Sequence, residues 1–230
     1  MEKRKKGRGR SSPALVLLAL TLLGGTAIAQ ELKQIALPAP QTHGGKPLME
    51  VLSLRATDRA FAADELSAQT LSNPLWAAWG INRPKGALRT APSAMDWQEI
   101  DVYVVMSSGA YIYDALTITL KPVAAGDYRA LTGVQDFVKD APVSLVYVAD
   151  AARMKVNISD TTMKAAMALK ESCKWADSAV ISENAYLYAA SEGLATGVRA
   201  LIHRPALSRL LKLNPEQSIT LAQCVGFPKK

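Results

Sequence analysis

Two arginines and a threonine near the start of the chain have the spacing of an anion-binding segment. Residues 53–61 read Ser-Leu-Arg-Ala-Thr-Asp-Arg-Ala-Phe, which places Thr57 between Arg55 and Arg59. In extended backbone these three side chains can face one way, because side chains alternate along such a chain. Paired guanidinium donors and a hydroxyl on one side suit a phosphate. The alternative is a solvated pair of arginines at the end of a helix.

A second polar segment leads into an apolar run. Residues 89–104 read Arg-Thr-Ala-Pro-Ser-Ala-Met-Asp-Trp-Gln-Glu-Ile-Asp-Val-Tyr-Val. Together with the first segment, it resembles the flavin-dependent nitroreductase superfamily, and the resemblance covers residues 48–226. In that superfamily an Arg-x-Ser/Thr-x-Arg turn holds the phosphate and ribityl chain of FMN. A Pro-Ser-Ala segment that leads into a strand lies along the isoalloxazine ring. The two motifs are specific as a pair and weak singly.

The resemblance implies three groups of FMN-binding residues. The phosphate contacts that it implies are Arg55, Ala56, Thr57 and Arg59, with Ala56 contributing only its backbone. The residues implied to lie along the ring are Pro92, Ser93 and Ala94. The residues implied at the family's Gly-Leu-Gly-Thr stretch, which passes the flavin, are Gly197, Val198 and Arg199.

Four further positions bear on how the flavin would be held and tuned. Asp96 stands where the family often has Asn, and an ionised Asp cannot donate a hydrogen bond and would repel a reduced, anionic flavin. Gln98 is a neutral amide nearby that would substitute for it. Arg199 would place a positive charge near the pyrimidine end of the ring, or else lie on a strand surface. Arg89 is a candidate for a second phosphate or substrate contact.

No side chain in the sequence is a convincing nucleophile or general base, so we assign no catalytic residue. This absence fits a flavoenzyme, because the redox chemistry then belongs to the cofactor. The chain has two histidines, His43 and His203, and no His or Cys cluster with metal-ligand spacing. We therefore expect no metal centre.

The positive charge of the chain is concentrated at its N-terminus. The formal net charge is +7 over 230 residues. Residues 1–29 hold six of the 27 Lys and Arg and one of the 20 acidic residues, which leaves 21 basic against 19 acidic beyond them. A net charge of +2 on the remainder removes the case for a nucleic-acid partner, which the whole-chain charge would otherwise raise.

The N-terminus has the three parts of a secretory signal peptide. A basic start is followed by an apolar run from Ala14 to Leu23, and Ala27 and Ala29 fit the small-x-small cleavage rule. The alternative is an uncleaved anchor, but the run is short for a span of about 20 residues. We expect residues 1–29 to be the signal, 30–46 a linker and 47–230 an FMN-binding domain. The protein would then be periplasmic or secreted, with no stable membrane anchor after cleavage.

The two cysteines would enter an oxidising compartment if the chain is exported. Cys173 lies in an expected helix and Cys224 in an expected strand. A disulfide would form only if the two meet in the fold. The favoured interpretation is two separate, small apolar side chains.

The periodicity of apolar residues predicts an α+β domain with a mixed sheet flanked by helices. The expected helices are residues 47–54, 63–79, 127–131, 135–139, 160–191 and 204–211. The expected strands are residues 100–106, 110–114, 115–122, 142–148, 193–200 and 218–226, with a loop at 81–88. In the 63–79 segment, Ser67 would cap the main helix and Pro74 would kink it or begin a second one. The resemblance implies a nitroreductase-like fold, in which the long central helix forms much of a homodimer interface.

These observations together predict an FMN-dependent, nitroreductase-like oxidoreductase that transfers two electrons through FMN. The acceptors that the family implies are nitroaromatic or quinone-type compounds, and the alternative is oxidation of an unknown organic substrate. Two other functions stay open, both on the same fold: a non-catalytic flavin-binding protein, or an exported binding protein that has lost the flavin. The expected partners are a small-molecule electron donor and acceptor and a second copy of the chain.

Overall fold

The structure is a computed structural model, and it describes Met1 and residues 31–157 and 162–230. The predicted signal peptide, apart from Met1, lies outside the described residues. Residues from Glu31 to Lys230 belong to one structural unit. Within the described ranges, no helix combines the length and the apolar character that a membrane crossing requires.

Four α-helices of the described residues lie close to the predicted positions. They are α1 (Leu48–Leu54), α2 (Ala68–Trp79), α3 (Met163–Glu192) and α4 (Arg204–Leu210). Ser67 caps α2 as predicted, because its hydroxyl accepts a hydrogen bond from the Thr70 amide at 3.0 Å, and Pro74 lies inside α2. α3 ends at Gly193, whose φ of 69° is a left-handed conformation that favours glycine.

A seven-stranded sheet forms the middle of the unit. Its strands are β1 (Ile35–Ala36), β4 (Ile100–Met106), β5 (Gly109–Asp114), β6 (Thr119–Ala125), β7 (Val143–Asp150), β8 (Ala195–Arg199) and β9 (Gln217–Gly226). The order across the sheet is β1-β6-β5-β4-β7-β9-β8. Five of the six predicted strands are confirmed, and the strand predicted at 142–148 is a buried interior strand, β7. The strand predicted at 115–122 begins only at Thr119, as β6, because residues 115–118 form the turn that follows β5.

Every strand pair in the described sheet is antiparallel, where the sequence predicts a mixed sheet. β7 and β8 point the same way, because each of them is antiparallel to β9. The last strand of the chain, β9, lies between these two, so that no parallel pair forms. The α+β class is confirmed, but the order of elements along the chain does not reveal where the last strand inserts.

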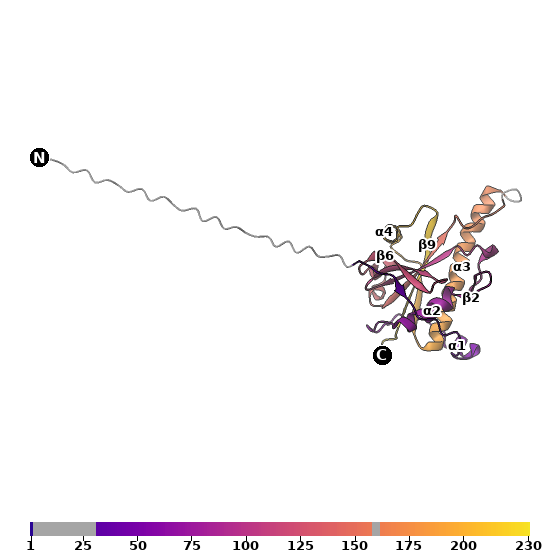
Figure 1. Ribbon diagram of the computed structural model, residues 1–230, viewed down its shortest axis with the longest axis horizontal. Coiled ribbons are helices and arrows are strands. Elements are labelled where there is room, and N and C mark those ends of the chain that lie inside the picture. Colours follow the sequence, from indigo (N-terminus) through magenta and orange to yellow (C-terminus); the bar gives the residue numbers. More distant parts are fainter. Residues whose placement is uncertain (2–30, 158–161) are drawn as a thin grey trace. The chain divides into compact units, whose positions relative to one another are not determined.

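Alternating side chains of the inner strands fill two cores, one on each face of the sheet. Val102 and Val104 of β4 contact a core that includes residues of α2 and α3. Tyr103 and Val105 of the same strand contact a second core that includes residues of α4. Figure 1 shows α2 and α3 together on one side of the sheet and α4 on the other. The long helix α3 is therefore positioned by the first core.

Three short segments differ from the predictions. The two helices predicted at 127–131 and 135–139 are single 3-10 turns, η2 (Arg129–Thr132) and η3 (Asp136–Lys139). The predicted loop at 81–88 contains a small hairpin of β2 (Ile81–Arg83) and β3 (Leu88–Arg89). Each segment is too short for hydrophobic periodicity to identify its type, because the pattern of apolar residues does not repeat within so few residues.

The segment predicted as a linker packs on the domain. β1 adds to the edge of the sheet by pairing with β6, and Leu37 is 8% exposed within the first core. The Ser72 hydroxyl of α2 donates a hydrogen bond to the Pro38 carbonyl at 2.6 Å. Residues 31–46 are therefore part of the same packed unit as the helices and the sheet.

Candidate functional site

The Arg55–Arg59 segment lies along β8, the edge strand of the sheet. The Asp58 amide donates a hydrogen bond to the Thr196 carbonyl at 2.9 Å. A Cβ atom added at Gly197 would lie 3.4 Å from Thr57 Cγ2 and 3.5 Å from Arg59 Cγ. The segment that follows α1 is thus brought against Gly197, as the sequence predicts for two parts of one site.

Tyr186 of α3 joins this segment to β8, and the sequence analysis did not identify it. Its hydroxyl lies 3.0 Å from the Thr57 hydroxyl and accepts a hydrogen bond from the Val198 amide at 2.8 Å. Its ring lies under the Arg55 guanidinium, with 5.5 Å from the guanidinium carbon to the ring centroid. In the sequence Tyr186 is one aromatic residue of a long helix, and only the tertiary contacts distinguish it.

Arg55 and Arg59 are held by aromatic rings and keep their hydrogen-bond donors free. The Arg59 guanidinium carbon lies 5.9 Å from the centre of the Phe137 ring, as Arg55 lies over Tyr186. Neither guanidinium has a hydrogen-bond or ion-pair partner among residues 31–157 and 162–230, and the backbone amides of Ala56 and Thr57 are also unpaired within those ranges. Cations that stack on rings while their N–H groups stay free are well suited to bind an anion.

The predicted ring-contact loop, residues 92–98, is strained. Met95, Asp96 and Gln98 have positive φ angles of 51°, 52° and 47°. Each non-glycine residue in this conformation costs about 1–2 kcal/mol, so other contacts must hold the loop. One such contact lies within the loop, where the Ser93 hydroxyl accepts a hydrogen bond from the Gln98 amide at 2.9 Å.

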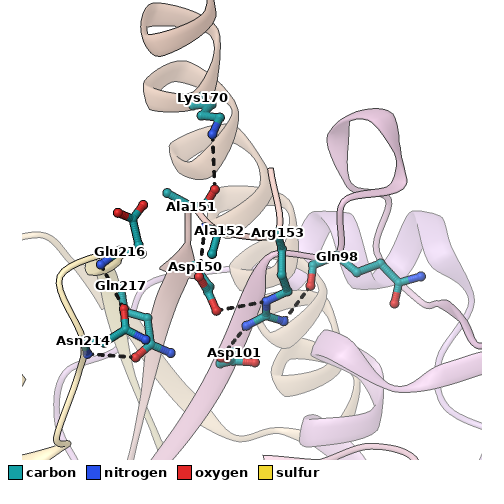
Figure 2. Close-up of polar contacts among 10 residues, drawn as sticks. All are labelled: Gln98, Asp101, Asp150, Ala151, Ala152, Arg153, Lys170, Asn214, Glu216 and Gln217. Carbon is teal, nitrogen blue, oxygen red and sulfur yellow. Dashed lines mark hydrogen bonds and ion pairs between the residues drawn. The ribbon is translucent and has the colours of Figure 1, made fainter. Parts of the chain in front are cut away.

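Two residues from distant parts of the chain hold this loop. The Ala94 amide donates a hydrogen bond to Asp177 Oδ2 on α3 at 2.8 Å. Arg153, which follows β7, donates from Nη1 to the Gln98 carbonyl at 2.9 Å and also pairs with Asp101 and Asp150. Figure 2 shows the Arg153 guanidinium between these three partners. The strained loop is therefore fixed by α3 on one side and by Arg153 on the other.

Gln98, Asp96 and Arg89 form a hydrogen-bonded series along the loop. The Gln98 side-chain amide donates to Asp96 Oδ1 at 3.1 Å, and its carbonyl accepts from Arg89 Nε at 3.0 Å. Arg89 also stacks on Trp79, at 4.8 Å from the ring centroid, and burial lowers its pKa. The amide of Gln98 thus partly compensates the charge of the Asp96 carboxylate. Arg89 supports the loop through its hydrogen bond to Gln98.

Two buried carboxyl groups lie behind the loop, and the sequence analysis identified neither of them. Glu99 is fully buried, and neither of its carboxyl oxygens has a hydrogen-bond partner among the described residues. Burial raises the pKa of Glu99 to about 7, and the neighbouring charge of Asp177 adds to the effect. Asp177 is 7% exposed. In the sequence Glu99 is one of three acids within residues 96–101, and no local pattern distinguishes it from the other two.

Arg199 lies in the interior, where the sequence predicted a ring contact or a surface position. It is 6% exposed, and its Nε donates to the Thr132 carbonyl at 2.9 Å. Its other two nitrogens donate to the side chains of Thr132, Ser144 and Cys224. Burial without an acidic partner lowers the pKa of this guanidinium. All three nitrogens are thus committed to protein atoms, so the structure does not place Arg199 with the free donors of Arg55 and Arg59.

The two halves of the candidate site contact α3 on opposite sides. The first half depends on Tyr186 and the second on Asp177. These residues are separated by about two and a half turns, which is roughly 14 Å along the axis and half a turn around it. Pro92 is exposed, and Ser93 and Ala94 are half-buried. The structure thus brings residues 55–59 together with 197–198. Residues 92–98 form a separate loop that contacts α3 at Asp177.

Neither the cysteines nor a metal cluster contributes to this site within the part of the chain that the structure describes. Cys173 and Cys224 are both free thiols, as the favoured interpretation predicts. No group of three or more His, Cys, Asp or Glu in the described ranges is arranged to hold a metal ion.

Comparison with known proteins identifies relatives of this chain. A family model described as "Nitroreductase family" matches residues 52–227. A crystal structure described as that of a nitroreductase from Ralstonia eutropha JMP134 is 40% identical, with a TM-score of 0.76 over 86% of this chain and 90% of that chain. No curated protein matches the chain.

Two more distant structures share the fold. A nitroreductase-type structure from Anabaena variabilis is 16% identical, with a TM-score of 0.66 over 86% of this chain and 42% of that chain. A chain of the Escherichia coli microcin synthetase McbBCD complex is 17% identical, with a TM-score of 0.63 over 95% of this chain and 85% of that chain.

Proposed function

The chain belongs to the nitroreductase family of oxidoreductases, and we propose that it binds FMN and transfers two electrons through it. The single observation that carries this proposal is the set of free donors on the Arg55–Arg59 segment. Two guanidinium groups and two backbone amides have no hydrogen-bond or ion-pair partner among the described residues. Such a set of donors can bind an anion that has several oxygen atoms, and a phosphate is such an anion.

The phosphate end of FMN would be held by Arg55, Thr57 and Arg59. Stacking on Tyr186 and Phe137 limits the motion of both arginines, so that less side-chain entropy is lost when the anion binds. The Thr57 hydroxyl is oriented by Tyr186. The donors at this end therefore fit the cofactor that the family implies.

The ring end would be held by the strained loop of residues 92–98. Its backbone is fixed from behind by Asp177 and Arg153, which leaves the exposed Pro92 side free for a planar ligand. Asp96 is the residue that least fits a flavin, because its charge would repel a reduced ring. The amide of Gln98 and the charge of Arg89 behind it offset that repulsion.

When bound, FMN supplies the two-electron chemistry, and the protein supplies binding, orientation and electrostatics. The free arginines bind the phosphate, and the rigid loop sets the plane of the ring. Electron acceptors of nitroaromatic or quinone type fit this chemistry, as does oxidation of an organic substrate. The partners would be a small-molecule electron donor and acceptor.

A homodimer would complete the site. The two halves of the site lie on opposite sides of α3, so a second copy is needed to bring a phosphate half and a ring half together. Helices α1 and α3, which pack on each other, also expose many apolar side chains. These are Leu48, Met49, Leu52, Leu54, Met163, Met167, Leu169, Trp175 and Val180.

The oligomeric state is tested by light scattering on the full chain. We expect the mass of two chains, and a shift toward one chain in Met167→Glu, because a charge would replace an apolar side chain that is 65% exposed. Arg209→Glu, which changes an exposed residue of α4, is the control and should stay dimeric. A single-chain mass for the unaltered protein would contradict the dimer.

Export through a cleaved signal peptide is the proposed localisation. The basic start, the apolar run and the Ala27-x-Ala29 pattern support it. Intact-mass measurement of protein from the exported fraction should show a chain that begins at Gln30. A chain that retains Met1 in that fraction would contradict cleavage.

The visible absorption spectrum of the full chain after incubation with FMN and desalting tests the cofactor. Flavin bands at a yield near one per chain are expected. Folded protein that retains no flavin would overturn the proposal and favour a binding protein that has lost the cofactor. If flavin is retained, a screen of donors against nitroaromatic and quinone acceptors follows. Bound FMN without turnover in that screen would favour the non-catalytic alternative.

A further inference from the structure

Glu99 and Asp177 are two neighbouring carboxyl groups inside the protein, directly behind the ring-contact loop. Glu99 has no exposed surface, and Asp177 is 7% exposed. Asp177 is bonded to the loop, because its Oδ2 accepts the Ala94 amide at 2.8 Å. Glu99 immediately follows the loop in the chain and makes no side-chain hydrogen bond within the described ranges.

An unpaired, fully buried carboxylate is costly, and two adjacent ones are costlier. A proton on Glu99 removes this cost, because it neutralises one charge and gives Glu99 a donor for Asp177. Burial raises the pKa of Glu99 to about 7, and the neighbouring charge of Asp177 contributes in the same direction. The pair therefore has a chemical reason to keep one proton under mildly acidic to neutral conditions.

Few other charged or titratable groups face this pair. On α3, Cys173 is close enough that both carboxyls raise its pKa, after the larger effect of burial. Arg153, beyond β7, lowers the pKa of Glu99, but its guanidinium is already paired with Asp101 and Asp150. Arg153 thus limits the repulsion between the two acids without bonding to either of them.

We propose that Glu99 and Asp177 share one proton, and that this proton positions Ala94 and the strained loop for the flavin ring. With the proton present, Asp177 stays between its two donors, Glu99 and the Ala94 amide. When the proton is lost, two like charges repel each other in the interior and Asp177 is displaced from Ala94. The link to the flavin rests on the proposed function, whereas the shared proton does not.

The loop should respond to this change because it stores backbone strain. The left-handed conformations of Met95, Asp96 and Gln98 persist only while the surrounding contacts hold them. Ala94 is bonded to Asp177, whereas Gln98 is bonded to Arg153 and Ser93. Loss of the proton should therefore release the Ala94 end of the loop and leave the Gln98 end in place. Glu99 and Asp177 are positioning residues in this proposal, with no role in the reaction itself.

The test is a pH titration of the flavin-free full chain followed by NMR. The amide proton of Ala94 reports directly on its bond to Asp177, and we expect its chemical shift to titrate with a midpoint near pH 7. In Glu99→Gln, whose amide also donates to Asp177 but does not ionise, this titration should disappear. In Asp177→Asn the carboxyl resonance of Glu99 should titrate at lower pH, since the neighbouring charge is gone.

Glu171→Gln is the matched control, because it makes the same chemical change at an exposed position of α3. It should keep the Ala94 titration unchanged. A pH range of roughly 5.5 to 8.5 brackets a pKa near 7. If the chemical shift of the Ala94 amide proton in the unaltered chain stays constant over this range, the proposal is overturned. Persistence of the titration in folded Glu99→Gln would overturn it as well.

A second measurement separates this proposal from the proposed function. If FMN binds, its dissociation constant should rise severalfold from pH 6 to pH 8 (roughly one unit on either side of the midpoint) in the unaltered chain and stay constant in Glu99→Gln. If FMN does not bind at all, the Ala94 titration still decides whether the proton is shared. If FMN binds with the same pH dependence in both proteins, the shared proton does not position the loop for the flavin.

Discussion

The two halves of the candidate site are built in opposite ways. The Arg55–Arg59 half is largely exposed, and its two guanidinium groups have no hydrogen-bond partner among the described residues. The ring-contact loop is strained, and its polar groups are bonded to residues far away in the chain, such as Asp177 and Arg153. One half thus presents its own side chains to a ligand, whereas the other presents a backbone surface that distant side chains hold.

This difference follows from what each half would bind. A phosphate is recognised by charge and hydrogen-bond donors, which side chains on an exposed segment can supply. A planar ring is recognised by shape, which needs a rigid backbone and therefore support from behind. We expect substitutions in the first half to act on affinity and substitutions in the second half to act on stability and pH dependence.

The largest effect should come from removing both free arginines. Arg55→Ala combined with Arg59→Ala should weaken FMN binding at least about 100-fold, because each charged hydrogen bond contributes roughly 1.5–3 kcal/mol. The unfolding temperature should change little, since neither guanidinium is hydrogen-bonded within the described protein. Quenching of flavin fluorescence measures the dissociation constant. Arg209→Ala, an exposed arginine on α4, is the control, and a threefold or smaller change in the double variant would contradict the assignment.

The free energy of unfolding should depend on pH because of Glu99, which lies behind the ring-contact loop. Glu99 has an ordinary pKa of 4.5 when unfolded and about 7 when folded. Between these values the native state holds more protons than the unfolded state, so the free energy of unfolding should fall as pH rises. We expect a loss of about 1–3 kcal/mol between pH 4.5 and pH 8, allowing for the coupling to Asp177.

Urea unfolding at several pH values measures this loss. Glu99→Gln should remove most of the slope and be more stable than the unaltered protein at pH 8, because its side chain does not ionise. Glu171→Gln should keep the slope. An equal slope in Glu99→Gln would assign the pH dependence to other groups.

Removal of one hydroxyl should affect the first half more mildly. Tyr186→Phe leaves the ring under Arg55 but deprives the Thr57 hydroxyl and the Val198 amide of their partner. We expect a loss of about 1–2 kcal/mol in the free energy of unfolding and up to about tenfold weaker FMN binding. Tyr128→Phe is the control, because the Tyr128 hydroxyl has no hydrogen-bond partner in the described ranges. An unchanged Thr57–Val198 region by amide hydrogen exchange would argue against the bridging role.

The smallest effect on affinity should come from Arg199. Its guanidinium is bonded to Thr132, Ser144 and Cys224 in the interior, so Arg199→Met should change the FMN dissociation constant less than about twofold. It should cost about 1–3 kcal/mol of stability, because the Thr132 carbonyl loses its partner. Affinity and unfolding measurements on the same variant check both statements. A large loss of affinity with normal stability would return Arg199 to the cofactor site.

Local sequence was sufficient for most of the elements and for proposing one half of the candidate site. The Ser67 cap and the apolar run at residues 142–148 are signals carried by neighbouring residues, and the structure confirms α2 and β7, the elements that they predict. The Arg-Ala-Thr-Asp-Arg segment was recognised because its donors lie within five consecutive residues. Such patterns need no knowledge of what packs against them.

Tertiary structure alone decided how the other half of the candidate site is supported. Glu99 and Asp177 are ordinary acids in the sequence, and they become a buried pair only because α3 packs behind the loop. Arg199 reads as a strand residue near the flavin, but β8 turns its side chain into the interior. The insertion of β9 between β7 and β8 likewise depends on contacts between segments that are far apart in the sequence. Burial and pairing of polar groups depend on which distant segments meet, and no local pattern encodes that information.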